Sequence, residues 1–168
     1  IYVKREDCQP ISAFKVRGGI NLVSRLTPAE KRRGVITAST GNHGQSIAYA
    51  CRLFGVRCTV VVPEGANPLK VEAMRNLAAE VQFHGRVYDD AREHAERQAA
   101  EQGYRYVHPS NEPLLVSGVA TETLEIFEEV PDLDVLFVPL GGGSGAAGAC
   151  IVAQAVNPKA RVIAVQSA

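Results

Sequence analysis

The sequence contains no tryptophan, a single methionine and no excess of charge of either sign. Because 18 lysines and arginines balance 18 aspartates and glutamates, no strongly basic surface is available to attract nucleic acid or an anionic membrane. No apolar run reaches the roughly 20 residues that a membrane-spanning helix needs. We therefore expect no nucleic-acid partner and no membrane segment.

Cysteine is also scarce, and its spacing carries no motif. Cys8, Cys51, Cys58 and Cys150 form no C-x-x-C pair and lack the histidine spacing of a zinc site. Free thiols are typical of a reducing compartment, and the sequence shows no recognisable signal peptide. We expect a cytoplasmic protein that holds no metal.

Apolar, β-branched segments alternate with segments of helical spacing along the chain. This alternation predicts an α/β fold with doubly wound parallel sheets. We expect 134–140 to be a fully buried strand and residues 1–7 to be strand-like. The other expected strands are 34–39, 57–63, 79–85, 104–109 and 161–166, and the expected helices are 43–54, 68–78, 89–102, 114–129 and 145–156.

Two glycine-rich turns follow expected strands, "STGNHGQS" at residues 39–46 and "GGGSGAAG" at residues 141–148. Ligands of parallel sheets bind at the carboxyl ends of strands. A glycine turn that opens a helix offers free N–H groups and a positive dipole end to a phosphate. The second turn also matches G-x-G-x-x-G, a pattern of dinucleotide sites, but Gln166 stands where that pattern places an acid. A nucleotide-binding oxidoreductase domain therefore stays an alternative.

One lysine lies in an unusual setting. Lys15 occurs in "SAFKVRGG", between an aromatic ring and a pair of glycines. An apolar setting lowers the pKa of a lysine, and a neutral amine can form a Schiff base with an aldehyde. Pyridoxal phosphate needs such a lysine, a phosphate cup and partners for its ring substituents. Lys15, the 141–145 turn and Asn42 could supply all three, although an exposed helical lysine is the alternative.

The segments "KREDCQPISAFKVRGG", "ITASTGNHGQSIAYA", "FVPLGGGSGAAG" and "VIAV" resemble the threonine/serine dehydratase (threonine ammonia-lyase) family of fold-type II pyridoxal phosphate enzymes, which is related to serine racemase. The resemblance runs along nearly the whole chain. Since members of that family are about twice as long, we expect the chain to cover only about half of the catalytic unit.

The resemblance implies a role for each motif. Lys15 would form the Schiff base with pyridoxal 5′-phosphate and act as the base at Cα, with Phe14 packed beside the cofactor. Asn42 would hydrogen-bond the hydroxyl oxygen of the pyridine ring. The phosphate cup would consist of Gly141, Gly142, Gly143, Ser144 and Gly145, and the substrate carboxylate would lie among Ser39, Thr40, Gly41, Asn42 and His43. A purely structural histidine, packed beside the helix start, is the alternative for His43.

The implied reaction is β-elimination of water and ammonia from L-threonine or L-serine, which gives 2-oxobutanoate or pyruvate. An amino-acid racemase, a hydroxyaspartate dehydratase of the same family and a non-catalytic fragment stay as alternatives. Residues 1–34 and 131–168 would belong to a large cofactor-binding domain, and 35–130 to a small domain. The resemblance also implies a homodimer or homotetramer that acts on a small amino acid.

Gln166 predicts that divalent cations have little effect on activity. Members of the resembling family that have a divalent-metal site place glutamate there, and an amide lacks the charge that a hard cation prefers. The activity of the full-length enzyme should be nearly the same with and without a chelator. A large loss that magnesium or calcium restores would contradict this expectation.

Overall fold

The computed structural model describes residues 1–166, and it confirms an α/β fold with parallel sheets. Every strand and helix expected from the sequence is present within a few residues of its expected bounds, apart from the strand-like start of the chain. In chain order the elements are η1 (Glu6–Cys8), α1 (Lys15–Ser24), α2 (Pro28–Arg33), β1 (Val35–Ala38), α3 (Asn42–Leu53), β2 (Cys58–Val62), α4 (Pro68–Asn76), β3 (Glu80–Phe83), α5 (Tyr88–Gln102), β4 (Arg105–Tyr106), α6 (Pro113–Glu129), β5 (Val135–Pro139), α7 (Ser144–Val156) and β6 (Arg161–Val165).

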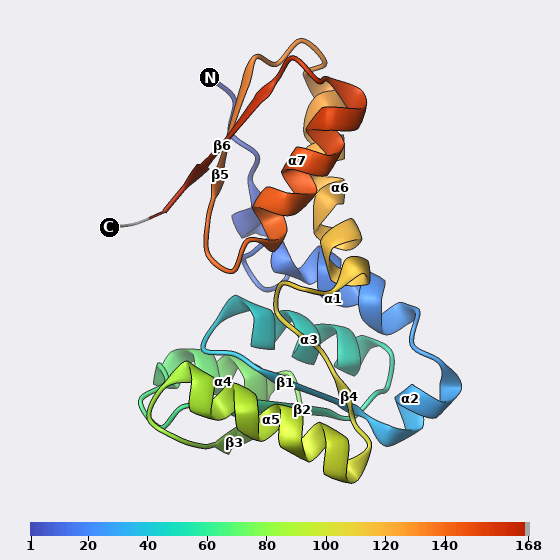
Figure 1. Ribbon diagram of the computed structural model, residues 1–168, viewed down its shortest axis with the longest axis vertical. Helices are drawn as coiled ribbons and strands as arrows, with labels where there is room; N and C mark the ends of the chain where they lie inside the picture. Colours follow the sequence, from blue (N-terminus) through green and yellow to red (C-terminus); the bar gives the residue numbers. More distant parts are fainter. Residues whose placement is uncertain (167–168) are drawn as a thin grey trace.

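The larger sheet has four parallel strands in the order β3-β2-β1-β4 and is covered on both faces. Because side chains alternate along a strand, Val35 of β1 packs toward α1 and α3, whereas Ile36 packs against the alanines of α5. The central strands β1 and β2 are wholly buried, whereas the edge strands β3 and β4 are partly exposed. The loops that follow β1, β2 and β4 leave the sheet at the same edge, as parallel pairing requires (Figure 1).

The second sheet contains only β5 and β6, which pair in parallel from Val135↔Arg161 to Pro139↔Val165. The expectation of a fully buried strand at 134–140 is wrong. The strand forms, but Phe137 is 67% exposed and Val165 is 52% exposed. In the part of the chain that the structure describes, helices α6 and α7 lie on one side of this sheet, so its other face stays uncovered.

The strand-like start expected at residues 1–7 is also wrong. Residues 1–5 have no regular structure, and η1 follows them. Charged side chains hold this segment instead: Lys4 Nζ lies 2.5 Å from a carboxylate oxygen of Glu125, and Arg17 bonds Glu6 at 2.8 Å. The apolar residues 1–3 and the charged residues 4–7 therefore belong to a segment that docks through ion pairs rather than to a paired strand.

Helix α1 was not expected from the sequence, because it contains the weak helix formers Gly18 and Gly19. The two glycines allow α1 to lie between α3 and α6. It thereby links the part of the fold that contains the four-stranded sheet to the part that contains the two-stranded sheet (Figure 1). A Cβ on Gly18 would lie 2.7 Å from the carbonyl oxygen of Leu115, and a Cβ on Gly19 would lie 2.7 Å from that of Ser46. Close packing thus outweighs the low helix propensity.

The division into a large domain (1–34 and 131–168) and a small one (35–130) stays a prediction. Helix α6 packs against both α1 and α7. Ser167 and Ala168, at the end of the proposed large domain, lie outside the described residues. None of the helices within residues 1–166 is both long enough and apolar enough to cross a membrane.

Replacing Gly19 by alanine should destabilise the protein by about 1–3 kcal/mol, because the added methyl group meets the backbone of Ser46 and one of the helices must move. Gly65→Ala is the matched control, since a Cβ there meets no atom within 4 Å and should change stability by less than about 0.5 kcal/mol. Urea unfolding midpoints measure both effects. Equal midpoints for the two variants would contradict the close-packing argument.

Candidate active site

The structure brings Lys15 and the second glycine turn together across the molecule. Lys15 is the first residue of α1, and its Nζ donates hydrogen bonds to Ser144 Oγ at 2.6 Å and to the carbonyl of Pro109 at 3.3 Å. Burial lowers the pKa of the Lys15 amine. This lysine is therefore a partly desolvated amine held by fixed partners, and not an exposed helical one.

The turn after β5 has the geometry of an anion site. Gly143 adopts a left-handed conformation, with φ of 93°, and α7 begins at the next residue, Ser144. The first N–H groups of a helix lack intrahelical partners and carry the positive end of its dipole. A Cβ at Gly141 or Gly143 would meet no atom within 4 Å, so the backbone there faces open space. A phosphate fits such a turn.

Phe14 closes one side of this turn. A Cβ on Gly145 would lie 3.0 Å from the Phe14 ring, so the glycine lets the ring lie against the start of α7. The Lys15 amine lies 5.7 Å from the centre of the same ring. An aromatic ring, an amine and an open phosphate turn thus meet at one place, and this donor set fits pyridoxal phosphate.

The loop 39–43 lies at the carboxyl end of β1, as expected, and its side chains differ in exposure. Ser39 is buried, and its Oγ accepts hydrogen bonds from the backbone N–H groups of Gly41 at 3.1 Å and Gly44 at 2.8 Å. Thr40 and Asn42 are exposed. Ser39 therefore shapes the loop, whereas Thr40 and Asn42 remain accessible to a ligand.

The imidazole of His43 is buried behind this loop and is bonded to the larger sheet. Thr37 Oγ1 donates to the carbonyl of Val107 at 2.7 Å, so it accepts from His43 Nε2 at 2.9 Å. Burial lowers the pKa of His43 to about 3, which keeps the ring neutral. These contacts are those of a packed, structural histidine. A role at the substrate carboxylate stays a prediction for His43.

The sequence reading missed the segment that follows β4. Pro109 supplies the carbonyl that accepts from Lys15, and the Ser110 Oγ would lie 2.5 Å from a Cβ on Gly142. His108 Nδ1 accepts from the backbone N–H groups of Ser110 and Asn111, which fixes the turn. The signal was available, because these residues follow an expected strand whose carboxyl end lies beside that of β1.

A second missed residue is Lys70, in the first turn of α4. Its Nζ donates to Oδ1 of Asn42 at 2.8 Å. No local pattern in the sequence joins residues 28 positions apart on different helices. Among residues 1–166, no group of three or more His, Cys, Asp or Glu side chains is arranged to hold a metal ion.

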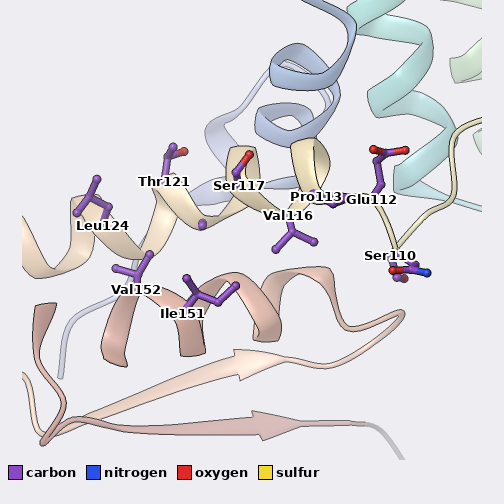
Figure 2. A pocket seen from close by; sticks show the side chains of 11 residues that line it. Ser110, Glu112, Pro113, Val116, Ser117, Thr121, Leu124, Ile151 and Val152 are labelled. Carbon is purple, nitrogen blue, oxygen red and sulfur yellow. The ribbon is translucent and has the colours of Figure 1, made fainter. Parts of the chain in front are cut away.

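Two cavities border the site. A groove of about 450 Å³ starts at Ser110 and runs between α6 and α7, with Val116, Ile151 and Val152 directed into it (Figure 2). A wider cavity of about 870 Å³ lies between β5, α6 and the start of the chain, and Phe14 and Gly145 form part of its wall. The candidate site therefore opens toward β5 and the start of the chain.

A family profile described as pyridoxal-phosphate dependent enzyme matches residues 1–168. The chain belongs to this family. Membership agrees with the meeting of Lys15, Phe14 and the 141–145 turn in the structure, and it identifies pyridoxal phosphate as the cofactor. The dinucleotide interpretation of G-x-G-x-x-G is thereby set aside.

Within the pyridoxal-phosphate dependent family, the similar proteins include amino-acid lyases and racemases. L-threonine ammonia-lyase of Thermotoga maritima is 41% identical over 99% of this chain and 42% of that protein. The processed form of threonine deaminase isoform 2 from Solanum lycopersicum has a TM-score of 0.92 at 34% identity, over 98% of this chain and 48% of that one. Serine racemase from Dictyostelium discoideum has a TM-score of 0.89 at 34% identity, over 97% of this chain and 53% of that one. The chain thus spans about half the length of these proteins, or less.

Gly143→Asp should weaken cofactor binding at least about tenfold more than Gly143→Asn. Both side chains have the same shape and tolerate a left-handed backbone, but only aspartate places a negative charge where N–H groups face the phosphate. Titration of the apo-enzyme with pyridoxal phosphate, followed by absorbance, measures both affinities. Equal affinities of the two variants would mean that the phosphate binds elsewhere.

Proposed function

We propose that the enzyme containing this chain catalyses β-elimination of water from L-threonine or L-serine, followed by hydrolytic release of ammonia, giving 2-oxobutanoate or pyruvate. The observation that carries the proposal is the 2.6 Å hydrogen bond between the Lys15 amine and Ser144 at the start of α7. It places a partly desolvated amine at the glycine turn. The similarity to L-threonine ammonia-lyase of Thermotoga maritima supports the choice of reaction.

Lys15 is the proposed acid–base group. Bound pyridoxal phosphate supplies an electron sink for the negative charge that develops at Cα of the substrate. The lowered pKa of the Lys15 amine raises the fraction that is neutral and able to take the Cα proton. Ser144 and the Pro109 carbonyl fix the amine in direction, which reduces the loss of entropy on reaching the reacting geometry.

The backbone of the second glycine turn and the first turn of α7 are proposed to hold the phosphate. This part of the site works through N–H groups rather than through charged side chains, since residues 141–145 include none. Phe14 covers the Gly145 side of the turn, excludes water there and gives a flat ring an apolar surface.

The loop 39–43 is proposed to hold the substrate carboxylate. Its exposed residue Thr40 offers a hydroxyl, and the start of α3 offers free N–H groups at the positive end of a helix dipole. Ser39 keeps these groups in place through its bonds to Gly41 and Gly44. Loss of the Cα proton and the β-hydroxyl removes one water, and hydrolysis of the released enamine returns that water and frees ammonia.

An amino-acid racemase is the second candidate, because Thr40 is an exposed hydroxyl residue in this loop. A hydroxyl that returns a proton to the face opposite Lys15 would invert Cα. Chiral analysis of L-serine incubated with the full-length enzyme separates the two reactions. We expect pyruvate to form faster than D-serine. If D-serine forms faster and Thr40→Ala stops it, racemisation is the main activity.

We further propose that the full-length enzyme is a cytoplasmic homodimer or homotetramer. Leu124 and Ile151 are 40% and 60% exposed and line the groove between α6 and α7 (Figure 2). Exposed apolar side chains that gather on one face are typical of protein interfaces. Light scattering of the purified enzyme distinguishes these assemblies from a monomer.

Lys15→Ala should abolish elimination, because no other lysine within residues 1–166 hydrogen-bonds to the glycine turn. The fold should stay intact. Borohydride reduction of the wild-type enzyme with bound cofactor, followed by peptide mapping, should place the adduct on Lys15. Circular dichroism of the variant serves as the control for folding. An adduct on Lys4 or Lys70 would refute the assignment.

A further inference from the structure

The amide of Asn42 has a defined orientation in the structure. Lys70 Nζ donates to Asn42 Oδ1 at 2.8 Å, and Gln45 Nε2 donates to the same oxygen at 3.5 Å. A lysine ammonium group has donors and no acceptor, so the atom it contacts must be the amide oxygen. The NH2 group of Asn42 is thereby the end of the amide that is left to donate to a ligand.

The place of Lys70 in α4 is electrostatically unfavourable by itself. Asn67 accepts from the backbone N–H of Leu69 at 2.9 Å and so caps the helix, with Pro68 next to it. Lys70 consequently lies in the first turn, where the dipole disfavours a positive charge. The amide oxygen of Asn42 compensates part of this cost. The position of Lys70 is therefore explained by its hydrogen bond to Asn42 and not by the stability of α4.

We propose that Lys70 is a positioning residue that holds the Asn42 amide with its NH2 group toward the ring oxygen of the cofactor. The inference rests on the proposed function and on the role that the family resemblance implies for Asn42, a hydrogen bond to that oxygen. Without Lys70, the amide can rotate by half a turn and present its own oxygen to the ring oxygen. Two acceptors then face each other, and the hydrogen bond is lost.

Cofactor titrations of four full-length proteins test the proposal: wild type, Lys70→Met, Asn42→Ala and the double variant. We expect Lys70→Met to weaken pyridoxal phosphate binding by about 5- to 30-fold and to shift the absorption band of the bound cofactor, which reports the environment of its ring oxygen. In the Asn42→Ala background, Lys70→Met should have no further effect, because the group it positions is absent. Lys70→Arg, which keeps charged donors, should restore most of the affinity.

Lys159→Met is the matched control for the loss of one positive charge, since Lys159 lies on the exposed turn before β6. It should bind the cofactor as the wild type does. Equal affinity and equal spectra of wild type and Lys70→Met would overturn the proposal, and so would an undiminished effect of Lys70→Met in the Asn42→Ala background. If Lys70→Met does not fold, Asn42→Asp replaces it: this change keeps an oxygen for Lys70 but removes the NH2 donor, so unchanged affinity would also overturn the proposal.

These titrations, combined with the borohydride test of Lys15, separate this inference from the proposed function. A wild-type enzyme that forms no borohydride-sensitive band, or forms it equally in Lys15→Ala, would overturn both. A wild-type enzyme with a band that depends on Lys15, together with a normal Lys70→Met variant, would overturn only the role of Lys70.

Discussion

The hydrogen bond between Lys15 and Ser144 joins parts of the chain that are 129 positions apart and belong to different layers of the fold. Lys15 starts α1, which packs on the helices beside the four-stranded sheet, and Ser144 starts α7, which packs on the two-stranded sheet. An amine without the glycine turn is an ordinary lysine, and the turn without the amine is a generic anion site. The chemistry of the site therefore depends on how firmly α1 is fixed between the layers.

Electrostatics and close packing fix α1 together. Arg17, two residues beyond Lys15, bonds the buried Glu6 and the partly exposed Glu125. The hydrogen bonds that Glu125 receives from Arg17 and Lys4 lower the pKa of its carboxyl to about 2. The network ties α1 to α6 and to the start of the chain. Breaking one member would leave a desolvated charge without its partner, which costs more than an exposed ion pair contributes.

Local patterns were sufficient for most of the fold, and they singled out Lys15 and the second glycine turn, which the structure brings together. Strand and helix periodicity predicted the α/β layers, and two glycine turns with one apolar lysine predicted where a cofactor would bind. Residues such as Pro109 and Lys70 were missed because their roles depend on contacts across the sheet edge, which no local pattern encodes. The exposure of Phe137 was missed for a different reason: an apolar strand looks the same whether one face or both are covered.

The glycine pair of α1 has a consequence for the accuracy of the site. One residue of an α-helix rises by about 1.5 Å, so sliding α1 by a single residue would break a hydrogen bond of the length that Lys15 makes. Gly18 lies against the backbone of Leu115 in α6 and Gly19 against that of Ser46 in α3, and an added Cβ at either would lie 2.7 Å from a carbonyl oxygen. Because these two close contacts lie on different sides of α1, they hold the helix in one register. The absence of side chains at these two positions thus fixes where α1 begins, and with it the position of the Lys15 amine at the glycine turn.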